Sequence, residues 1–170
     1  MDAYKAIVTK RDTREYTDRK IPEEVLHRIL MAGRMAGSSK NTEPVRLVII
    51  QDREWLKEVA TCGKFSQPLL TARVGIAVCC APDGSDFDAG RAAQNMMVAA
   101  WNEGIASCPT SVHDQPCIIE KLRLPQEGED PVTGRKGWRA VVILALGYPP
   151  EGAQMSMGRA RVDMGEYVHR

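Results

Sequence analysis

The segment Asp86–Asn102, which reads DFDAGRAAQNMMVAAWN, says most about the fold of this chain. It is rich in strong helix formers and is predicted to be one continuous helix, which Gly104 ends. Its alanine, methionine and tryptophan side chains are spread nearly all round that helix, whereas a surface helix carries a single apolar stripe. The helix is therefore expected to lie at the centre of the domain or in an oligomer interface.

Three apolar runs flank this helix in the sequence and predict buried strands at residues 45–50, 72–81 and 139–147. The middle run is apolar almost without a break, so both faces of its strand are expected to be covered. Other helices are predicted over residues 3–9, 22–35, 53–60 and 116–122. Loops are predicted over residues 10–16, 37–44, 105–114 and 125–137.

This order of strands and helices indicates a layered α/β or α+β domain, and periodicity does not choose between the two classes. A length of 170 residues fits one domain, which is expected to span residues 1–170. The helix that is apolar on all sides suggests that the core is completed by dimerisation.

Charge and cysteine usage exclude several classes of function. The chain has 23 Lys and Arg against 22 Asp and Glu, so no global field attracts nucleic acid. No apolar stretch approaches the roughly 20 residues that span a bilayer, and the N-terminus does not resemble a secretory signal. A cytoplasmic protein with reduced cysteines is expected. No cysteine or histidine pattern has zinc spacing, so no structural metal is expected.

Four polar features stand out as candidate binding residues. Lys10, Arg11 and Arg14 place three cations within five residues, a set suited to phosphate. The loop Ser38–Asn41 offers hydroxyl and amide groups, and the run Gly104–Ser111 offers small residues that allow close approach of backbone. Arg159 and Arg161 lie in a tail without a clear period. Taken alone, the first three features are better explained as a charged surface, a plain turn and a connector, and the fourth fits a solvated tail equally well.

Together and in this order, these features resemble the nitroreductase family of flavin enzymes. The stretch Lys10-Arg11-Asp12-Thr13-Arg14-Glu15-Tyr16 is similar to the family's Arg-Arg-Ser-x-Arg-x-Phe, and residues 36–45 are similar to Ala-Pro-Ser-x-x-Asn-x-Gln-Pro-Trp. Gln94-Asn95-Met96-Met97-Val98-Ala99-Ala100, followed by Gly104-Ile105-Ala106, matches a third motif. Gly147-Tyr148-Pro149 matches the last. The resemblance spans nearly the whole chain.

The resemblance implies an α+β fold, a three-layer α-β-α sandwich around a mixed, mainly antiparallel sheet. It also implies a homodimer with C-terminal segment exchange and one flavin mononucleotide (FMN) in each of two interface sites. The residues implied around the phosphate and ribityl chain are Lys10, Arg11, Asp12, Arg14, Arg159 and Arg161. Ser38, Ser39 and Asn41 of the other subunit would line the flavin, and Pro109, Thr110 and Ser111 would lie near its reactive edge.

The activity implied is electron transfer from NADH or NADPH through FMN to a nitro compound, quinone or related acceptor, with ping-pong kinetics. No catalytic side chain is implied. Two alternatives remain: a flavin-fragmenting or reductive-dehalogenase relative, and a flavin-binding protein without turnover. The chain departs from the family pattern at Lys10, Asp12, Glu43 and Val45. It also lacks the long insertion that covers the substrate in larger members.

Overall fold

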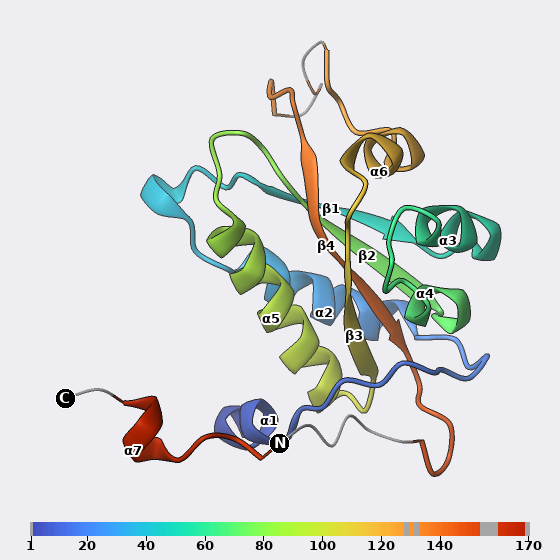
Figure 1. Ribbon diagram of the computed structural model, residues 1–170, viewed down its shortest axis with the longest axis vertical. Coiled ribbons are helices and arrows are strands. Elements are labelled where there is room, and N and C mark those ends of the chain that lie inside the picture. Colours follow the sequence, from blue (N-terminus) through green and yellow to red (C-terminus); the bar gives the residue numbers. More distant parts are fainter. Residues whose placement is uncertain (1, 128–129, 131–132, 154–159, 169–170) are drawn as a thin grey trace.

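The computed structural model describes residues 2–127, 130, 133–153 and 160–168 (Figure 1). The helices are α1 (Ala3–Thr9), α2 (Glu23–Arg34), α3 (Arg53–Ala60), α4 (Pro68–Thr71), α5 (Asp86–Asn102), α6 (Gln115–Leu122) and α7 (Met164–Tyr167), with one 3-10 turn, η1 (Ser39–Asn41). The strands are β1 (Val45–Ile50), β2 (Val74–Cys80), β3 (Ala106–Ser111) and β4 (Arg139–Gly147). Within these residues no helix is long and apolar enough to cross a membrane.

The four strands form one sheet in the order β1-β2-β4-β3, and every neighbouring pair is antiparallel. This antiparallel pattern identifies the α+β class, whereas the periodicity of the sequence did not distinguish α+β from α/β. The sheet was expected to be mixed, but the parallel pairing in the described residues is a single bridge between Asp12 and Ser107. Strands β1 and β3 form the two edges of the sheet.

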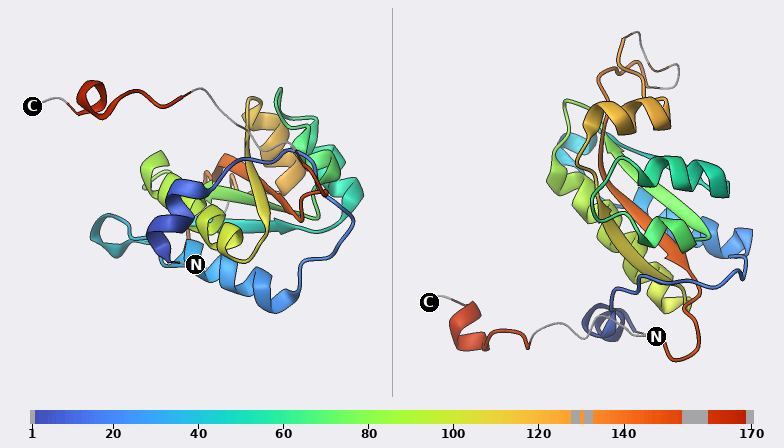
Figure 2. Two further views of the ribbon diagram at one scale, coloured as in Figure 1. Left: turned by 90° about the horizontal axis from the view of Figure 1, so that it is seen from below. Right: turned by 45° about the vertical axis from the view of Figure 1, so that its right-hand side comes forward.

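Helices cover both faces of the sheet, as Figures 1 and 2 show. The side chains of β2 alternate between two apolar clusters. Ile76 and Val78 join the cluster under α2 and α5, whereas Ala77 and Cys79 join the cluster under α3, α4 and α6. Every residue of β2 is buried, which confirms that both faces of this strand are covered. The core is therefore two apolar layers separated by the sheet.

Helix α5 runs along one face of the sheet and is the longest helix described. Ser85 and Asp88 form a reciprocal capping box at its start. Met96 is fully buried against α2, where a Cβ on Gly33 would lie only 2.7 Å from Met96 Cγ. The absence of a side chain at Gly33 thus allows α2 and α5 to approach closely, and the expectation of a central helix is confirmed.

The run 105–114 was expected to be a loop, and this expectation is wrong, because residues 106–111 form the edge strand β3. Its small and polar side chains lack the β-branched apolar pattern of a buried strand. Pairing with β4 along its whole length makes it a strand nevertheless. Pro109 is tolerated because an edge strand leaves alternate backbone positions unpaired.

The expectation of fully reduced cysteines is also wrong, because Cys62 and Cys117 form a disulfide. Their Cα atoms lie 5.6 Å apart, within the range that a disulfide requires. The two residues are 55 positions apart in the sequence, and only the packing of α3 beside α6 brings them together. Cys79, Cys80 and Cys108 are free thiols, and all three are buried.

The C-terminal tail leaves the body of the molecule. Residues 160–168, which include α7, project outwards in all views of Figures 1 and 2. Val162, Met164 and Tyr167 are more than half exposed there. Arg161 lies in this exposed tail, whereas Arg159 lies outside the described residues.

The close contact between Gly147 and Tyr16 gives a test of the packing. A Cβ on Gly147 would lie 2.6 Å from Tyr16 Cβ, which is not a flexible atom. We expect Gly147→Ala to lower the free energy of unfolding by about 1–3 kcal/mol, the usual cost of overpacking. Gly90→Ala is the control, since no described atom lies within 4 Å of its Cβ position on α5. Urea denaturation should show no loss of unfolding free energy in the Gly90→Ala variant. Equal losses in both variants would contradict the close packing of Gly147 against Tyr16.

Candidate functional site

The N-terminal cation stretch is fixed against the outer edge of β3. The backbone of Asp12 pairs with Ser107, and the Thr13 N–H donates to the Ser107 carbonyl at 3.2 Å. The Tyr16 hydroxyl lies within 2.5 Å of the Thr13 carbonyl and 3.1 Å of the Ala145 carbonyl in β4. Burial raises the pKa of Tyr16, so the phenol stays protonated and can donate. These contacts place residues 10–14 beside β3.

Within this stretch the charges of Lys10 and Asp12 compensate each other. The Lys10 ammonium donates to the Asp12 carboxylate, and it also lies 3.5 Å from Met97 Sδ. The Lys10 side chain is 9% exposed and that of Asp12 is 34% exposed. Asp12, at a position where the family has serine, thus has a cation as its partner. The net positive charge of the stretch comes from the two arginines.

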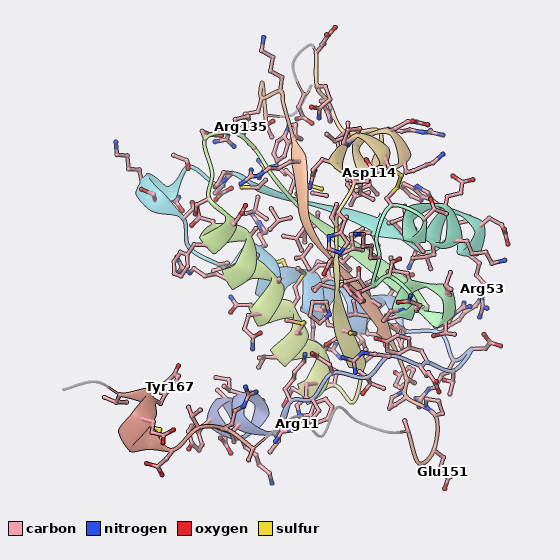
Figure 3. The ribbon with its side chains drawn as sticks, in the orientation of Figure 1. Arg11, Arg53, Asp114, Arg135, Glu151 and Tyr167 are labelled. Atoms are coloured by element: carbon pink, nitrogen blue, oxygen red, sulfur yellow. A yellow bond between two sulfur atoms is a disulfide. The ribbon has the colours of Figure 1, made fainter. Side chains whose placement is uncertain are left out.

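Arg11 and Arg14 are both exposed, and neither has an acidic partner among the described residues. Arg11 Nη1 donates to the backbone carbonyls of Val8 and Lys10, at 3.0 and 2.8 Å. The guanidinium of Arg11 lies at the surface close to α1 (Figure 3). Arg14 is close enough to Tyr16 and Cys108 for its charge to act on both side chains. Two guanidinium groups beside one strand edge form a donor set suited to a phosphate.

The outer edge of β3 presents backbone groups to the same region. Since the Ser107 carbonyl accepts from Thr13, it points away from β4. The backbone groups of alternate residues in an antiparallel strand point to the same side. The backbone nitrogen of Pro109 therefore faces this outer side, so the proline costs no hydrogen bond to β4. The Ser111 N–H points to the same outer side. At about 3.3 Å per residue, Ser107 and Ser111 are about 13 Å apart, which gives room for an elongated ligand.

In β3 and the adjoining cation stretch, some polar side chains have hydrogen-bond partners and others do not. Pro109 and Ser111 are exposed, whereas Thr110 is buried and its hydroxyl donates to the Ile143 carbonyl at 2.9 Å. Thr110 thus has a structural partner, and the side chains facing outwards are those of Pro109 and Ser111. The hydroxyls of Thr13 and Ser107 are buried without a partner among the described residues. Unused polar groups and unpaired cations therefore gather at this junction, which fits an anionic, hydroxyl-bearing ligand.

The second predicted element, Ser38–Asn41, forms an exposed turn with an unusual backbone. Lys40, Asn41 and Glu43 have φ angles of 51°, 53° and 48°, in the left-handed region that costs about 1–2 kcal/mol per residue outside glycine. The Ser38 hydroxyl accepts from the Glu43 N–H at 2.9 Å. Ser39 and Asn41 are exposed, and no described residue bonds to their side chains. The strained turn presents these two side chains to solvent.

Two arginines brace this turn from the side of the sheet. Arg135 Nη2 donates to the Thr42 carbonyl at 2.6 Å and Nη1 donates to the Glu43 carbonyl at 3.1 Å. Arg135 also pairs with Asp83 at 3.0 Å. Arg46 Nη1 donates to the Glu43 carbonyl at 2.9 Å. These charge-assisted bonds offset the backbone strain and hold the turn in one conformation.

One chain does not bring the two predicted elements together. Figure 3 shows Arg11 at one end of the molecule and Arg135, which braces the Ser38–Asn41 turn, at the other. Helix α5 lies between them, and its 17 residues correspond to a length of about 25 Å. Lys10, Arg11, Asp12 and Arg14 do lie beside the strand that carries Pro109–Ser111. A ligand on that strand cannot also contact Ser39 and Asn41 of the same chain.

A cavity of about 480 Å³ lies elsewhere, between α2, α5 and β1. Leu30, Met31, Leu47 and Ile49 give it an apolar wall, and Ser38 and Glu43 lie at its polar end. It does not touch the arginines of the cation stretch. Among the residues described here, no group of three or more His, Cys, Asp or Glu side chains is arranged to hold a metal ion.

Sequence analysis missed several residues near the site. Phe65 and His113 form an edge-to-face pair with centroids 6.0 Å apart, and the neighbouring Gly63 packs against the Ser111 carbonyl. Arg135 lies in the run 125–137, for which the sequence predicts only a loop. No local pattern identifies these residues, because each acts through a contact with a distant segment.

The antiparallel α+β sandwich, with two arginines beside an edge strand that have no acidic partner among the described residues, defines the class of fold, and comparisons identify the family. Residues 7–65 and 81–148 match the sequence profile of the Nitroreductase family. A protein of Archaeoglobus fulgidus, whose name refers to NADH dehydrogenase or NAD(P)H nitroreductase activity, is 33% identical over 129 residues, 72% of this chain and 74% of that protein. The chain belongs to the nitroreductase family.

Solved structures of low sequence identity share the fold. An FMN-dependent nitroreductase from Clostridium difficile R20291 has a TM-score of 0.80 at 22% identity, with 98% of each chain covered. NADPH:FMN oxidoreductase from Vibrio harveyi, complexed with NAD+, has a TM-score of 0.82 at 22% identity, with 99% of this chain and 76% of that chain covered. The nitroreductase-like α+β fold expected from the sequence is thus confirmed.

The bracing of the turn by Arg135 can be tested directly. We expect Arg135→Ala to release the turn, so that the backbone order parameters of Asn41 and Glu43 fall from about 0.85 towards about 0.6 in NMR relaxation. Lys136→Ala is the control, because this neighbouring side chain is exposed and makes no described contact with the turn. Unchanged order parameters in the Arg135 variant would show that the turn needs no brace.

Proposed function

We propose that the chain is an FMN-dependent oxidoreductase that transfers electrons from NADH or NADPH to a nitro compound, quinone or related acceptor by a ping-pong mechanism. The observation that carries this proposal is the pair of arginines, Arg11 and Arg14, without acidic partners beside the open edge of β3. Membership of the nitroreductase family, and the names of relatives that use FMN and NAD(P)H, support it.

The phosphate end of FMN would be bound by Arg11 and Arg14, whose guanidinium groups can each form paired hydrogen bonds with phosphate oxygens. Lys10 contributes less charge than its position suggests, because Asp12 neutralises it. The Asp12 carboxylate can still accept from a ribityl hydroxyl at its exposed side. Arg159 and Arg161 would join this end as tail residues, as the family resemblance implies.

The ring end would lie over Pro109 and Ser111. When bound, FMN would supply the redox chemistry that links oxidation of the nicotinamide to reduction of the acceptor. The Ser111 N–H, on the outer side of β3, is placed to donate a hydrogen bond to the ring edge. These residues bind and orient, and no side chain of the chain has to act as an acid or base.

Completion of the site would require a second copy of the chain. We propose a homodimer in which Ser38, Ser39 and Asn41 of the partner reach the flavin, since the same chain's turn lies at the far end of α5. Three features support segment exchange: the unpaired edge of β1, the apolar cavity beside it, and the tail with its exposed Val162 and Met164. The tail would cover the edge of β1 and the cavity in the partner.

Flavin binding and reduction test the proposal. The purified protein is expected to bind about one FMN per chain, and Arg14→Ala should weaken FMN binding by about 1.5–3 kcal/mol, the contribution of a charge-assisted hydrogen bond. Arg53→Ala is the matched control, because this exposed arginine pairs with Asp18 away from the cation stretch. Binding is measured by quenching of FMN fluorescence.

The same protein distinguishes an enzyme from a carrier. Anaerobic mixing with NADH or NADPH should bleach the absorbance of bound FMN, and addition of a quinone should restore it. A protein that does not bind FMN would refute the proposal as a whole. A protein whose bound FMN is not reduced by either nucleotide would be a flavin-binding protein without turnover.

A further inference from the structure

The disulfide joins two elements next to the proposed ring end of the site. Cys62 lies two residues after the end of α3. Cys117 lies in the first turn of α6, whose capping residue Asp114 is labelled in Figure 3. The Cys62 side chain is 4% exposed, whereas Cys117 is half-buried. A surface hollow of about 600 Å³, whose lining includes Cys62, Lys64, His113 and Asp114, opens beside the bond. The hollow at Cys62 and the partial exposure of Cys117 give a small thiol access to the bond.

The position of Cys117 favours its reduced form. It is the third residue of α6, and a thiolate in the first turn of a helix is stabilised by the helix dipole and the free N–H groups. Asp114, whose carboxylate accepts from the Cys117 N–H at 3.0 Å, opposes this effect, whereas Lys64 and His113 line the hollow at Cys62. Stabilisation of the thiolate makes the disulfide easier to reduce.

The segment that carries Cys62 packs directly on the end of β3. A Cβ on Gly63 would lie 2.5 Å from the Ser111 carbonyl, so the two backbones are in contact. The Ser66 hydroxyl donates to the Gly63 carbonyl at 2.6 Å, and the Asp114 N–H donates to the Cys62 carbonyl at 3.2 Å. Without the covalent bond, the segment 62–66 would still be joined to residues 113–114 by the Asp114–Cys62 hydrogen bond and the Phe65–His113 ring contact, which are weaker.

We propose that Cys62 and Cys117 form a reversible dithiol–disulfide pair, reduced in the folded protein by small-molecule thiols, and that its state adjusts Ser111 at the flavin site. The coupling to flavin rests on the proposed function, whereas reversibility does not. In the first step an external thiolate bonds to Cys117 Sγ and the Cys62 sulfur leaves and takes a proton. A second external thiol then attacks the mixed disulfide and releases Cys117, so that two thiols become one external disulfide.

Reversibility is tested by counting thiols in the folded protein. Wild-type protein is equilibrated in buffers of reduced and oxidised glutathione, quenched with acid, unfolded and alkylated, and the mass shows how many cysteines react. We expect three alkylated cysteines in the most oxidising buffer, the free thiols of the structure, and all five in the most reducing one. Cys108→Ser is the control, and it should keep the transition with one thiol fewer throughout.

Two results would overturn reversibility. If the count stays at three in the most reducing buffer until denaturant is added, the bond is purely structural. If the count is five in every buffer, the pair does not form a disulfide under these conditions. Cys62→Ser combined with Cys117→Ser should show no transition, which ties the two additional thiols to this pair.

The coupling is tested by FMN titration of the oxidised and the reduced protein. We expect the dissociation constant to differ by about fivefold or more between the two states, the lower range of allosteric coupling. The double serine variant should show one dissociation constant in both buffers. Equal affinity in the two states of the wild type would refute the coupling. A lack of FMN binding in both states would instead refute the proposed function, while the thiol count would still decide reversibility.

Discussion

The candidate site depends on one short backbone contact, the pairing of Asp12 and Thr13 with Ser107. This contact turns the stretch after α1 into an extension of the sheet at the outer edge of β3. The Tyr16 hydroxyl ties the end of the stretch to β4, where Gly147 leaves room for its ring. Without these constraints Arg11 and Arg14 would belong to a mobile loop. With them, two guanidinium groups stand at a fixed place beside a strand whose backbone is open to a ligand.

The remaining parts of the proposed site follow from the layered architecture. Helix α5 separates the cation stretch from the Ser38–Asn41 turn, so the two parts of the proposed site lie at opposite ends of a single chain. A two-fold related pair of chains can bring the cation stretch of one next to the turn of the other. Arg135 and Arg46 fix the strained turn, and the Cys62–Cys117 bond lies behind Ser111. The proposed flavin site is thus held in place by contacts from segments that lie far apart in the sequence.

Elements whose conformation follows from the residue pattern of their own segment could be predicted from the sequence, whereas those that depend on contacts with distant segments could not. The spacing of apolar residues predicted α5 and the strands β1, β2 and β4, because burial on these elements repeats along the chain. Strand β3 was missed because its small side chains owe their conformation to pairing with β4. The disulfide and the role of Arg135 were missed because they arise from contacts between segments far apart in sequence. The order of motifs predicted the family, which the comparisons confirm, but the Lys10–Asp12 ion pair could be seen only in three dimensions.

The central claim is that two chains build each flavin site, and mixed dimers test it most directly. Arg11→Ala with Arg14→Ala in one chain, and Ser39→Ala with Asn41→Gly in the other, would each weaken FMN binding in their own homodimers. Mixed dimers, co-expressed and purified through two different tags, carry one intact site and one doubly altered site. The account predicts tight binding of one FMN per mixed dimer. Binding as weak as in both parent homodimers would contradict it.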